Sequence, residues 1–129
     1  MAQEAIAALP YPGAPLDGLY EPISYSMSAG GKRLRPSLTL LSAEAFGGDA
    51  REAVDAAVGL EMFHNFTLLH DDVMDNSDMR RSRPTVHKKW DVNTAILSGD
   101  TMLTLATQLM TRVPDAALRR VLDAFNAMA

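Results

Sequence analysis

The sequence contains no cysteine, few aromatic residues and no long apolar run. The absence of cysteine from the 129 residues excludes a disulfide-stabilised fold and any metal site built on thiolates. No uninterrupted apolar segment approaches the roughly 18 residues that a membrane-spanning helix requires. Basic residues are also in the minority, at 12 against 16 acidic residues, which gives a net charge of −4. A domain that binds nucleic acid through its charge is basic overall, so nucleic acid is not an expected partner.

The overall composition is typical of a soluble globular domain. Hydrophobic residues make up 47% of the chain and charged residues 22%. The amino-terminal segment MAQEAIAALPYPGAP has no basic region and carries Glu4, so it does not resemble a secretory signal. We therefore expect a single cytoplasmic domain.

The charged residues are clustered rather than scattered. Eight of the basic residues lie in two short segments: Lys32, Arg33 and Arg35, then Arg80, Arg81, Arg83, Lys88 and Lys89. Four acidic residues come directly before the second segment: Asp71, Asp72, Asp75 and Asp78. Neighbouring clusters of opposite sign indicate a site that binds anions and cations together.

The hydrophobic pattern predicts an all-α fold. Residues 1–18 are rich in proline and glycine and are expected to form an extended arm. Apolar residues then recur with helical spacing, and glycine or proline interrupts them at intervals. The predicted helices, about five in number, cover residues 19–28, 35–46, 50–79, 92–112 and 115–129. The last one reaches Ala129 without a capping signal, which fits either a frayed terminus or a piece of a longer protein.

The aspartates on the third predicted helix form a candidate metal site. At about 100° per residue, Asp71 and Asp75 lie on one face, one turn apart, and Asp78 and His64 fall on the same stripe. Carboxylates four residues apart repel one another in a helix, so such a run calls for an explanation. Clustered carboxylates bind hard cations such as Mg²⁺, which bridge them to substrate phosphates. The alternative is a solvated acidic face that the following arginines neutralise.

Two basic segments are candidate phosphate sites. In the segment GGKRLRP, two glycines free the backbone, and Lys32 and Arg35 flank the start of a helix, which favours anions. Arg80 and Arg81 follow the aspartates, and arginine forks match phosphate oxygens. The alternatives are a simple basic loop and arginines that only neutralise the aspartates.

Three motifs, taken together, resemble one enzyme family. GGKRLRP, EMFHNFTLLHDDVMDNSDMRRSRPTVHKKW and NTAILSGD, in this order and at these intervals, are similar to the amino-terminal half of the trans-isoprenyl diphosphate synthases, also called polyprenyl synthetases. The resemblance begins near Tyr20 and continues to the end of the chain. It implies part of an isoprenoid-synthase helical bundle around a central cavity. It also implies an enzyme that condenses an allylic diphosphate with isopentenyl diphosphate.

The resemblance also implies roles for individual residues. Asp71 and Asp75 match carboxylates that bind Mg²⁺ on the allylic diphosphate, and Asp72 lies within the same catalytic motif. Arg80 matches an arginine that contacts the allylic diphosphate. The positions that bind isopentenyl diphosphate correspond to Lys32, Arg35, His64 and Arg81. Bulky residues four or five positions before the first aspartate control chain length in this family. Phe66 and Thr67 occupy those positions here, and a single aromatic residue favours a C15–C20 product.

The sequence departs from the family pattern in two ways. Ser82 stands where the family usually has glycine after the two arginines. The family is more than twice as long, and its second aspartate-rich motif has no counterpart here, because the acids after Asp78 are isolated. The prediction is then that a longer parent protein is the active prenyltransferase and that this chain alone has little or no activity. The alternative is a non-catalytic half-protein that binds Mg²⁺–diphosphate and needs a partner chain. Either way we expect exposed apolar helix faces and a homodimer or other self-association.

Overall fold

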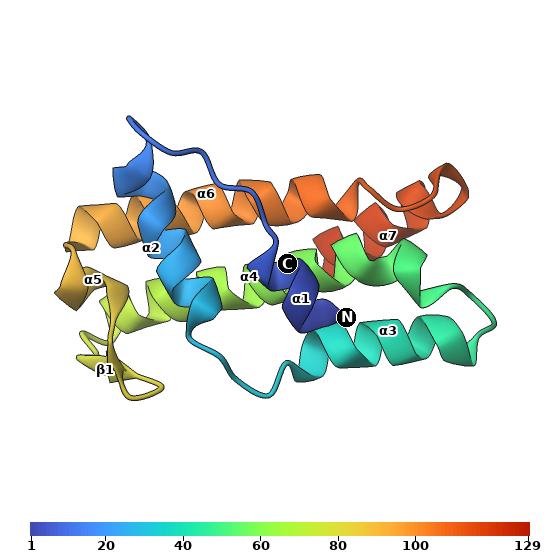
Figure 1. Ribbon diagram of the computed structural model, residues 1–129, viewed down its shortest axis with the longest axis horizontal. Coiled ribbons are helices and arrows are strands. Elements are labelled where there is room, and N and C mark those ends of the chain that lie inside the picture. The colour runs from blue at the N-terminus through green and yellow to red at the C-terminus, as the bar shows by residue number, and fades with distance from the viewer.

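The computed structural model describes residues 1–129 as seven helices and one two-stranded hairpin (Figure 1). The elements in chain order are α1 (Ala2–Ala7), α2 (Asp17–Ser28), α3 (Leu34–Ala45), α4 (Ala50–Met74), β1 (Met79–Arg80), β2 (Arg83–Pro84), α5 (Val86–Lys89), α6 (Val92–Met110) and α7 (Asp115–Met128). The predicted all-α class is confirmed. None of the helices combines the length and the apolarity needed to cross a membrane.

Two predicted boundaries are wrong. The segment expected to be an extended arm, residues 1–18, begins with helix α1, whose Ile6 is buried in the core. The long helix ends at Met74 rather than Met79, because Asn76 adopts a left-handed backbone conformation with φ of 51°. A left-handed residue just after the last turn is a common way for a helix to end. Asp78 therefore lies beyond the helix and does not continue the aspartate stripe.

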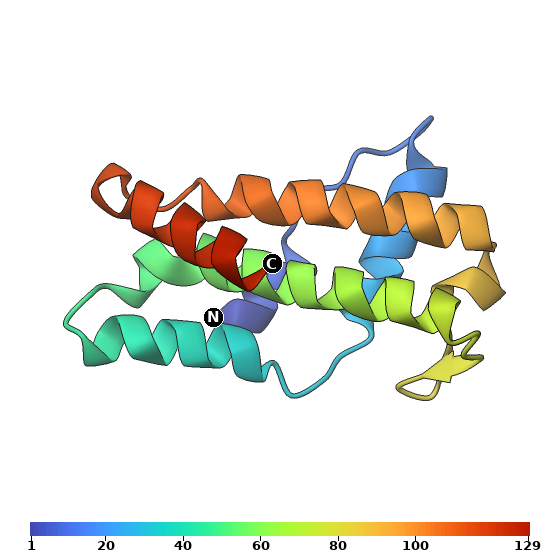
Figure 2. The same cartoon turned by 180° about the vertical axis from the view of Figure 1, so that it is seen from behind.

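Helix α4 is the central element of the molecule. It lies between α3 and α6, and these three helices run side by side in both views (Figures 1 and 2). Helices α1 and α2 cross one face of this layer, and α7 covers part of the other face. The start of α4 is fixed by Asp49, whose carboxylate accepts a hydrogen bond from the Arg51 N–H at 2.9 Å.

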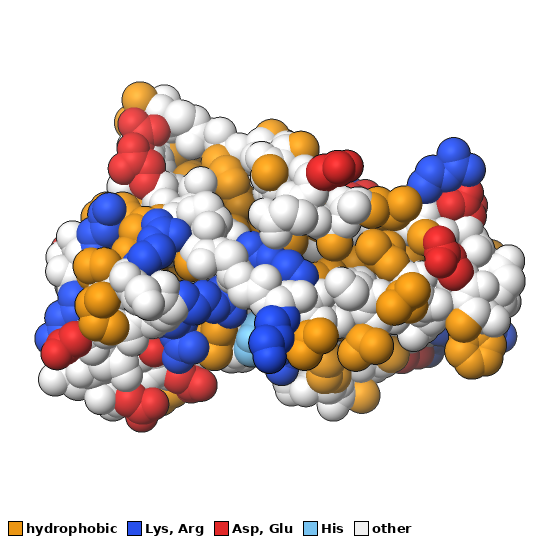
Figure 3. Space-filling view, turned by 60° about the horizontal axis from the view of Figure 1, so that its bottom comes forward, with side chains coloured by type: hydrophobic (Ala, Val, Ile, Leu, Met, Phe, Trp, Pro, Cys, Tyr) orange, Lys and Arg blue, Asp and Glu red, His pale blue; other side chains and the backbone are white.

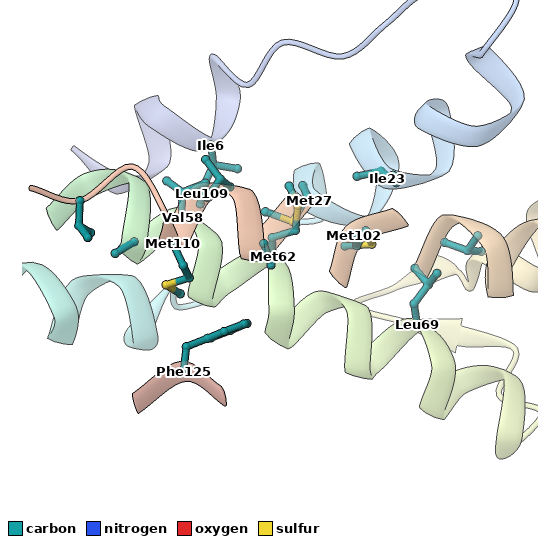
Figure 4. Close-up of a cluster of buried hydrophobic side chains, with 14 of the residues drawn as sticks. Ile6, Ile23, Met27, Val58, Met62, Leu69, Met102, Leu109, Met110 and Phe125 are labelled. Atoms are coloured by element: carbon teal, nitrogen blue, oxygen red, sulfur yellow. The ribbon is translucent and has the colours of Figure 1, made fainter. Parts of the chain in front are cut away.

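The core follows α4 along most of its length. Methionine is prominent in it, and the side chains meet from α1, α2, α4, α6 and α7 (Figure 4). The labelled members are Ile6, Ile23, Met27, Val58, Met62, Leu69, Met102, Leu109, Met110 and Phe125. Full burial of a side chain of this size contributes about 1.5–3 kcal/mol. This packing fixes α4, and with it the position of the residues at its carboxyl end.

The outward face of α3 is apolar and uncovered. Leu34, Leu38 and Leu41 recur every three to four residues and are 59%, 61% and 60% exposed. Phe46, just after the helix, is 93% exposed. In Figure 3, hydrophobic side chains follow the half of the surface over α3, whereas basic side chains gather on the other half. The expected exposed apolar face is therefore present.

Candidate functional site

The carboxyl end of α4 presents two free carboxylates. Asp71 lies in the last full turn, and Asp75 caps the helix, with its N–H donating to the Asp71 carbonyl oxygen at 2.8 Å. Both side chains are exposed. Neither forms an ion pair or a side-chain hydrogen bond within the chain, so both are available to a ligand.

Asp72 differs from its two neighbours. It is 5% exposed, and its two carboxylate oxygens accept hydrogen bonds from Nε and Nη2 of Arg80, both at 2.8 Å. This bidentate contact is the largest influence on the pKa of Arg80, which it raises. Of the three predicted aspartates, the structure thus leaves two facing solvent, whereas Asp72 is turned toward the arginine hairpin.

The hairpin turns at Arg81 and Ser82. Strands β1 and β2 pair antiparallel, and both turn residues have left-handed φ angles, 52° and 62°. Glycine adopts such angles most easily. Ser82, which stands where glycine was expected, therefore holds a backbone conformation that is less favourable for a residue with a side chain. Tyr25 of α2 supports the hairpin, because its hydroxyl donates to the Pro84 carbonyl oxygen at 2.7 Å. The guanidinium of Arg83 also lies 3.8 Å from the centre of the Tyr25 ring.

The segment between α2 and α3, residues 29–33, is called the glycine loop because it contains Gly30 and Gly31. It lies directly against this hairpin. A Cβ atom at Gly31 would lie 3.3 Å from both Cζ and Nη2 of Arg81, so the absence of a side chain lets the guanidinium lie against the backbone. The φ of Gly31, 130°, also strongly favours glycine. Lys32 and Arg35 follow and are exposed. Two segments 50 residues apart in sequence, at Gly31 and Arg81, therefore lie against each other.

His64 lies among these cations. Partial burial is the largest cause that lowers its pKa, and the charges of Arg35, Arg81 and Arg80 lower it further, while Glu61 opposes them. A neutral imidazole at neutral pH follows. Figure 3 shows a histidine among Lys and Arg side chains, with acidic side chains at the edge of the same region. The structure thus brings together the predicted residues Arg35, His64, Arg80 and Arg81, whereas Lys32 is exposed next to Gly31 and makes no contact with them.

The candidate chain-length residues lie one turn before the aspartates. Phe66 packs against Phe63 and His70, with ring centroids 5.6 Å and 4.9 Å apart. Phe63 in turn contacts Phe125 of α7 at 5.3 Å. The Thr67 hydroxyl donates to the His64 carbonyl oxygen at 2.6 Å. Phe66, Phe63 and Phe125 thus form a row of aromatic rings that runs from the polar end of α4 to the apolar core.

The donor set suits Mg²⁺ better than a metal that needs a complete protein cage. No group of three or more His, Cys, Asp or Glu side chains comes together in the chain. Mg²⁺ uses one or two carboxylates and takes its remaining ligands from water and substrate phosphates. Asp71 and Asp75 supply two such carboxylates, and cations that would hold a phosphate lie nearby.

Sequence reasoning missed several residues that hold this site in place. Tyr25 and Glu61 were not singled out, nor was the contact between His70 and Gly99. A Cβ atom at Gly99 would clash with the imidazole of His70, so the glycine leaves room for that ring in its observed position. Glu61 carried a usable signal, because a glutamate that the helical period places toward the core requires a cationic partner.

Comparisons with known proteins agree with these motifs. The family model described as polyprenyl synthetase matches residues 17–129. A geranylgeranyl pyrophosphate synthase from Geoglobus acetivorans is 47% identical over 113 residues, which are 88% of this chain and 35% of that protein. A farnesyl diphosphate synthase from Micrococcus luteus is 50% identical over 92 residues, 70% of this chain and 32% of the relative.

Solved structures give the same result for the fold. The geranylgeranyl pyrophosphate synthetase from Pyrococcus horikoshii superposes with a TM-score of 0.89 at 41% identity, covering 98% of this chain and 39% of that one. The corresponding Geoglobus acetivorans structure gives 0.88 at 44% identity, over 98% and 41%. The chain spans about a third of the length of the curated relatives it matches.

Proposed function

This chain belongs to the polyprenyl synthetase family, and we propose that it supplies the diphosphate-binding portion of a Mg²⁺-dependent prenyltransferase. The proposed reaction condenses an allylic diphosphate with isopentenyl diphosphate to give a C15–C20 product. The observation that carries the proposal is the convergence of the glycine loop, His64 and the arginine hairpin beside two free carboxylates. The relatives named above are short-chain synthases, which supports the proposed product class.

The two exposed aspartates are assigned to the allylic diphosphate. Asp71 and Asp75 would hold Mg²⁺, which supplies Lewis-acid stabilisation of the departing diphosphate. Arg80 is held at the edge of this region by Asp72 and keeps its charge at any working pH, because its pKa is raised. A fixed cation beside a developing anion stabilises the transition state without reorganisation.

The second diphosphate is assigned to the cations around His64. Lys32 comes from the glycine loop, Arg35 from the first turn of α3, and Arg81 from the tip of the hairpin. His64, neutral when free, can donate one ring N–H to a phosphate oxygen without adding to the repulsion among the three cations. Phe66 and its aromatic neighbours form an apolar wall that would shield an allylic cation from water.

A non-catalytic half-protein is the second candidate. It is favoured by the uncovered leucines of α3, which a partner chain would bury. Both candidates require Mg²⁺–diphosphate binding at the same residues, and they differ in whether this chain alone transfers a prenyl group.

Calorimetric titration with inorganic pyrophosphate tests the proposed site. We expect binding that requires Mg²⁺ and that falls by at least tenfold in the variant Asp71→Asn/Asp75→Asn, because both metal ligands lose their charge. The matched control is Asp115→Asn/Asp123→Asn, which removes the same charge from exposed positions on α7. Equal loss in both variants would show a general charge effect and contradict the proposed site.

Prenyl transfer is measured separately with labelled isopentenyl diphosphate, a C5–C15 allylic diphosphate and Mg²⁺. We expect little or no elongated product from this chain alone. Product formation by the chain alone would exclude the half-protein candidate.

A further inference from the structure

Arg33 lies in the middle of the basic loop but is turned away from its neighbours into the protein. It is 8% exposed, whereas Lys32 and Arg35 are exposed. Its Nη1 donates to Oε1 of Glu61 at 2.8 Å, and its Nη2 donates to the Met27 carbonyl oxygen at 2.6 Å. Arg33 is therefore not available to a ligand, although it belongs to the same charged segment.

A third hydrogen bond also holds the Arg33 guanidinium. Nε of Arg33 donates to Oε1 of Gln3 in α1 at 3.0 Å. One guanidinium thus bonds to residues of α1, α2 and α4, while its own backbone immediately precedes α3. No other side chain in the structure connects so many elements by hydrogen bonds.

Glu61 is as deeply enclosed as its partner. It is 3% exposed, and Nδ2 of Asn65 donates to the same Oε1 atom at 3.2 Å. Glu61 lies three residues before His64, and its charge opposes the lowering of the His64 pKa by burial. A buried ion pair loses much of its Coulomb energy to desolvation, so stability alone is a weak reason for it.

The pair constrains the backbone from which the ligand cations extend. Arg33 has a left-handed φ of 53°, an uncommon conformation for a residue with a long side chain. Lys32 precedes it directly, and Arg35 lies two residues later in the first turn of α3. Fixing Arg33 therefore fixes the directions in which both neighbours leave the backbone.

Arg33 and Glu61 act in opposite directions on the hairpin tip. Burial is the largest cause that lowers the pKa of Arg81; the charge of Arg33 lowers it further, and the charge of Glu61 raises it. Removing both charges together leaves the net charge of the chain unchanged and disturbs the local charge less than removing either one alone. A double variant therefore separates the geometric role of the pair from its charge better than a single variant does.

We propose that Arg33 and Glu61 are a positioning pair that holds Lys32 and Arg35 in the arrangement that binds a diphosphate. This role rests on the proposed function, because it presupposes that the loop binds a diphosphate. Arg33 does not contact the ligand itself, and it acts only through the two cations that flank it.

The test compares three variants of the 129-residue chain by titration with inorganic pyrophosphate in the presence of Mg²⁺. Arg33→Met/Glu61→Met replaces the pair by apolar side chains of similar length, a change that often leaves stability unaltered or improved. Lys32→Ala/Arg35→Ala removes the proposed ligands themselves. Arg119→Met/Asp123→Met applies the same chemistry to an exposed ion pair on α7.

We expect the Arg33→Met/Glu61→Met variant to bind pyrophosphate about tenfold more weakly, the usual scale for loss of an outer supporting contact, with no fall in melting temperature. The α7 variant should bind like the unmodified chain. Unchanged affinity in the folded Arg33→Met/Glu61→Met variant, with weaker binding by Lys32→Ala/Arg35→Ala, would overturn the positioning role and leave the proposed function intact. An unmodified chain that binds no better than Lys32→Ala/Arg35→Ala would overturn the assignment of a diphosphate to Lys32 and Arg35, on which the positioning role rests.

A conservative variant keeps the test decisive if the double replacement does not fold. Arg33→Lys retains the positive charge opposite Glu61 but loses the planar fork that reaches three acceptors. The positioning role predicts about tenfold weaker pyrophosphate binding for Arg33→Lys as well. Full affinity in this variant would contradict the role.

Discussion

The carboxyl end of α4 and the outward face of α3 lie in different halves of the fold and are opposite in character (Figures 1 and 3). Toward the carboxyl end of α4, internal contacts hold several side chains in place: Arg80 on Asp72, Arg33 on Glu61, and Tyr25 beneath the hairpin. The α3 face has three leucines about 60% exposed with nothing packed on them. The polar end is organised by contacts within the chain, whereas no part of the chain covers the apolar face.

Disrupting the contact between His70 of α4 and Gly99 of α6 should lower the unfolding free energy the most. Gly99→Ala would place a methyl group against the imidazole of His70, which would have to move away from the Ile96 carbonyl oxygen and from its packing on Phe66. We expect a loss of about 2–3 kcal/mol in unfolding free energy, within the range of typical overpacking costs. Chemical denaturation measures it. Gly18→Ala is the control, because a Cβ atom there meets nothing within 4 Å, and equal loss in both would contradict the clash.

Breaking the ion pair between Asp72 and Arg80 should lower the unfolding free energy somewhat less. Asp72→Ala leaves the guanidinium of Arg80 without its two acceptors at 2.8 Å. Because Arg80 is partly exposed and water replaces part of the loss, we expect about 2 kcal/mol of destabilisation and weaker pyrophosphate binding. Denaturation and calorimetry on the same samples measure both. Retention of full pyrophosphate affinity would show that Arg80 needs no orientation by Asp72.

Changing the apolar face should alter association rather than folding. Leu38→Glu/Leu41→Glu places two charges on the exposed stripe of α3. We expect the self-association of the chain to decrease, with a change in unfolding free energy of no more than about 0.5 kcal/mol. Analytical ultracentrifugation gives the association state. If the unmodified chain is monomeric at all concentrations, this face does not mediate self-association.

The smallest effect is the titration of His64. Its pKa in the folded chain lies below the ordinary value of 6.5, chiefly because of burial. The folded state therefore binds fewer protons than the unfolded state, so this contribution to stability is present above pH 6.5 and is lost as pH falls through the lower folded value. Proton NMR measures the pKa directly. Pyrophosphate should raise it, and an unchanged value would place the anion elsewhere.

The sequence predicted the starts of α4 and α6 correctly from apolar spacing. In the structure Asp49 and Asp91 precede these starts, and both carboxylates accept a backbone N–H within the first turn. The end of α4 was misplaced because the helical period continues to Met79, although Asn76, Ser77 and Asp78 together form a turn signal. Helix α1 was missed because the prolines and glycines that follow it dominate the composition of residues 1–18.

The candidate site was predictable as a set of residues but not as an arrangement. Local spacing placed Asp71 and Asp75 one turn apart, and helix geometry alone accounts for that. It could not distinguish Asp72, whose partner Arg80 lies beyond the helix end in a hairpin that the periodicity did not indicate. Nor could it pair Arg33 with Glu61, 28 residues away, because such a contact depends on how α3 and α4 pack.

The most direct test of the account is a map of the backbone amide signals of the chain by NMR as Mg²⁺ and pyrophosphate are added. Two adjoining diphosphate sites predict that signals from residues 31–35, His64 and Arg81 shift together with one apparent dissociation constant, and that signals from Asp71, Asp75 and Arg80 shift together with a second one that requires Mg²⁺. Shifts confined to a single segment, or spread evenly over the basic side chains of the surface, would show that the three motifs do not form these two sites.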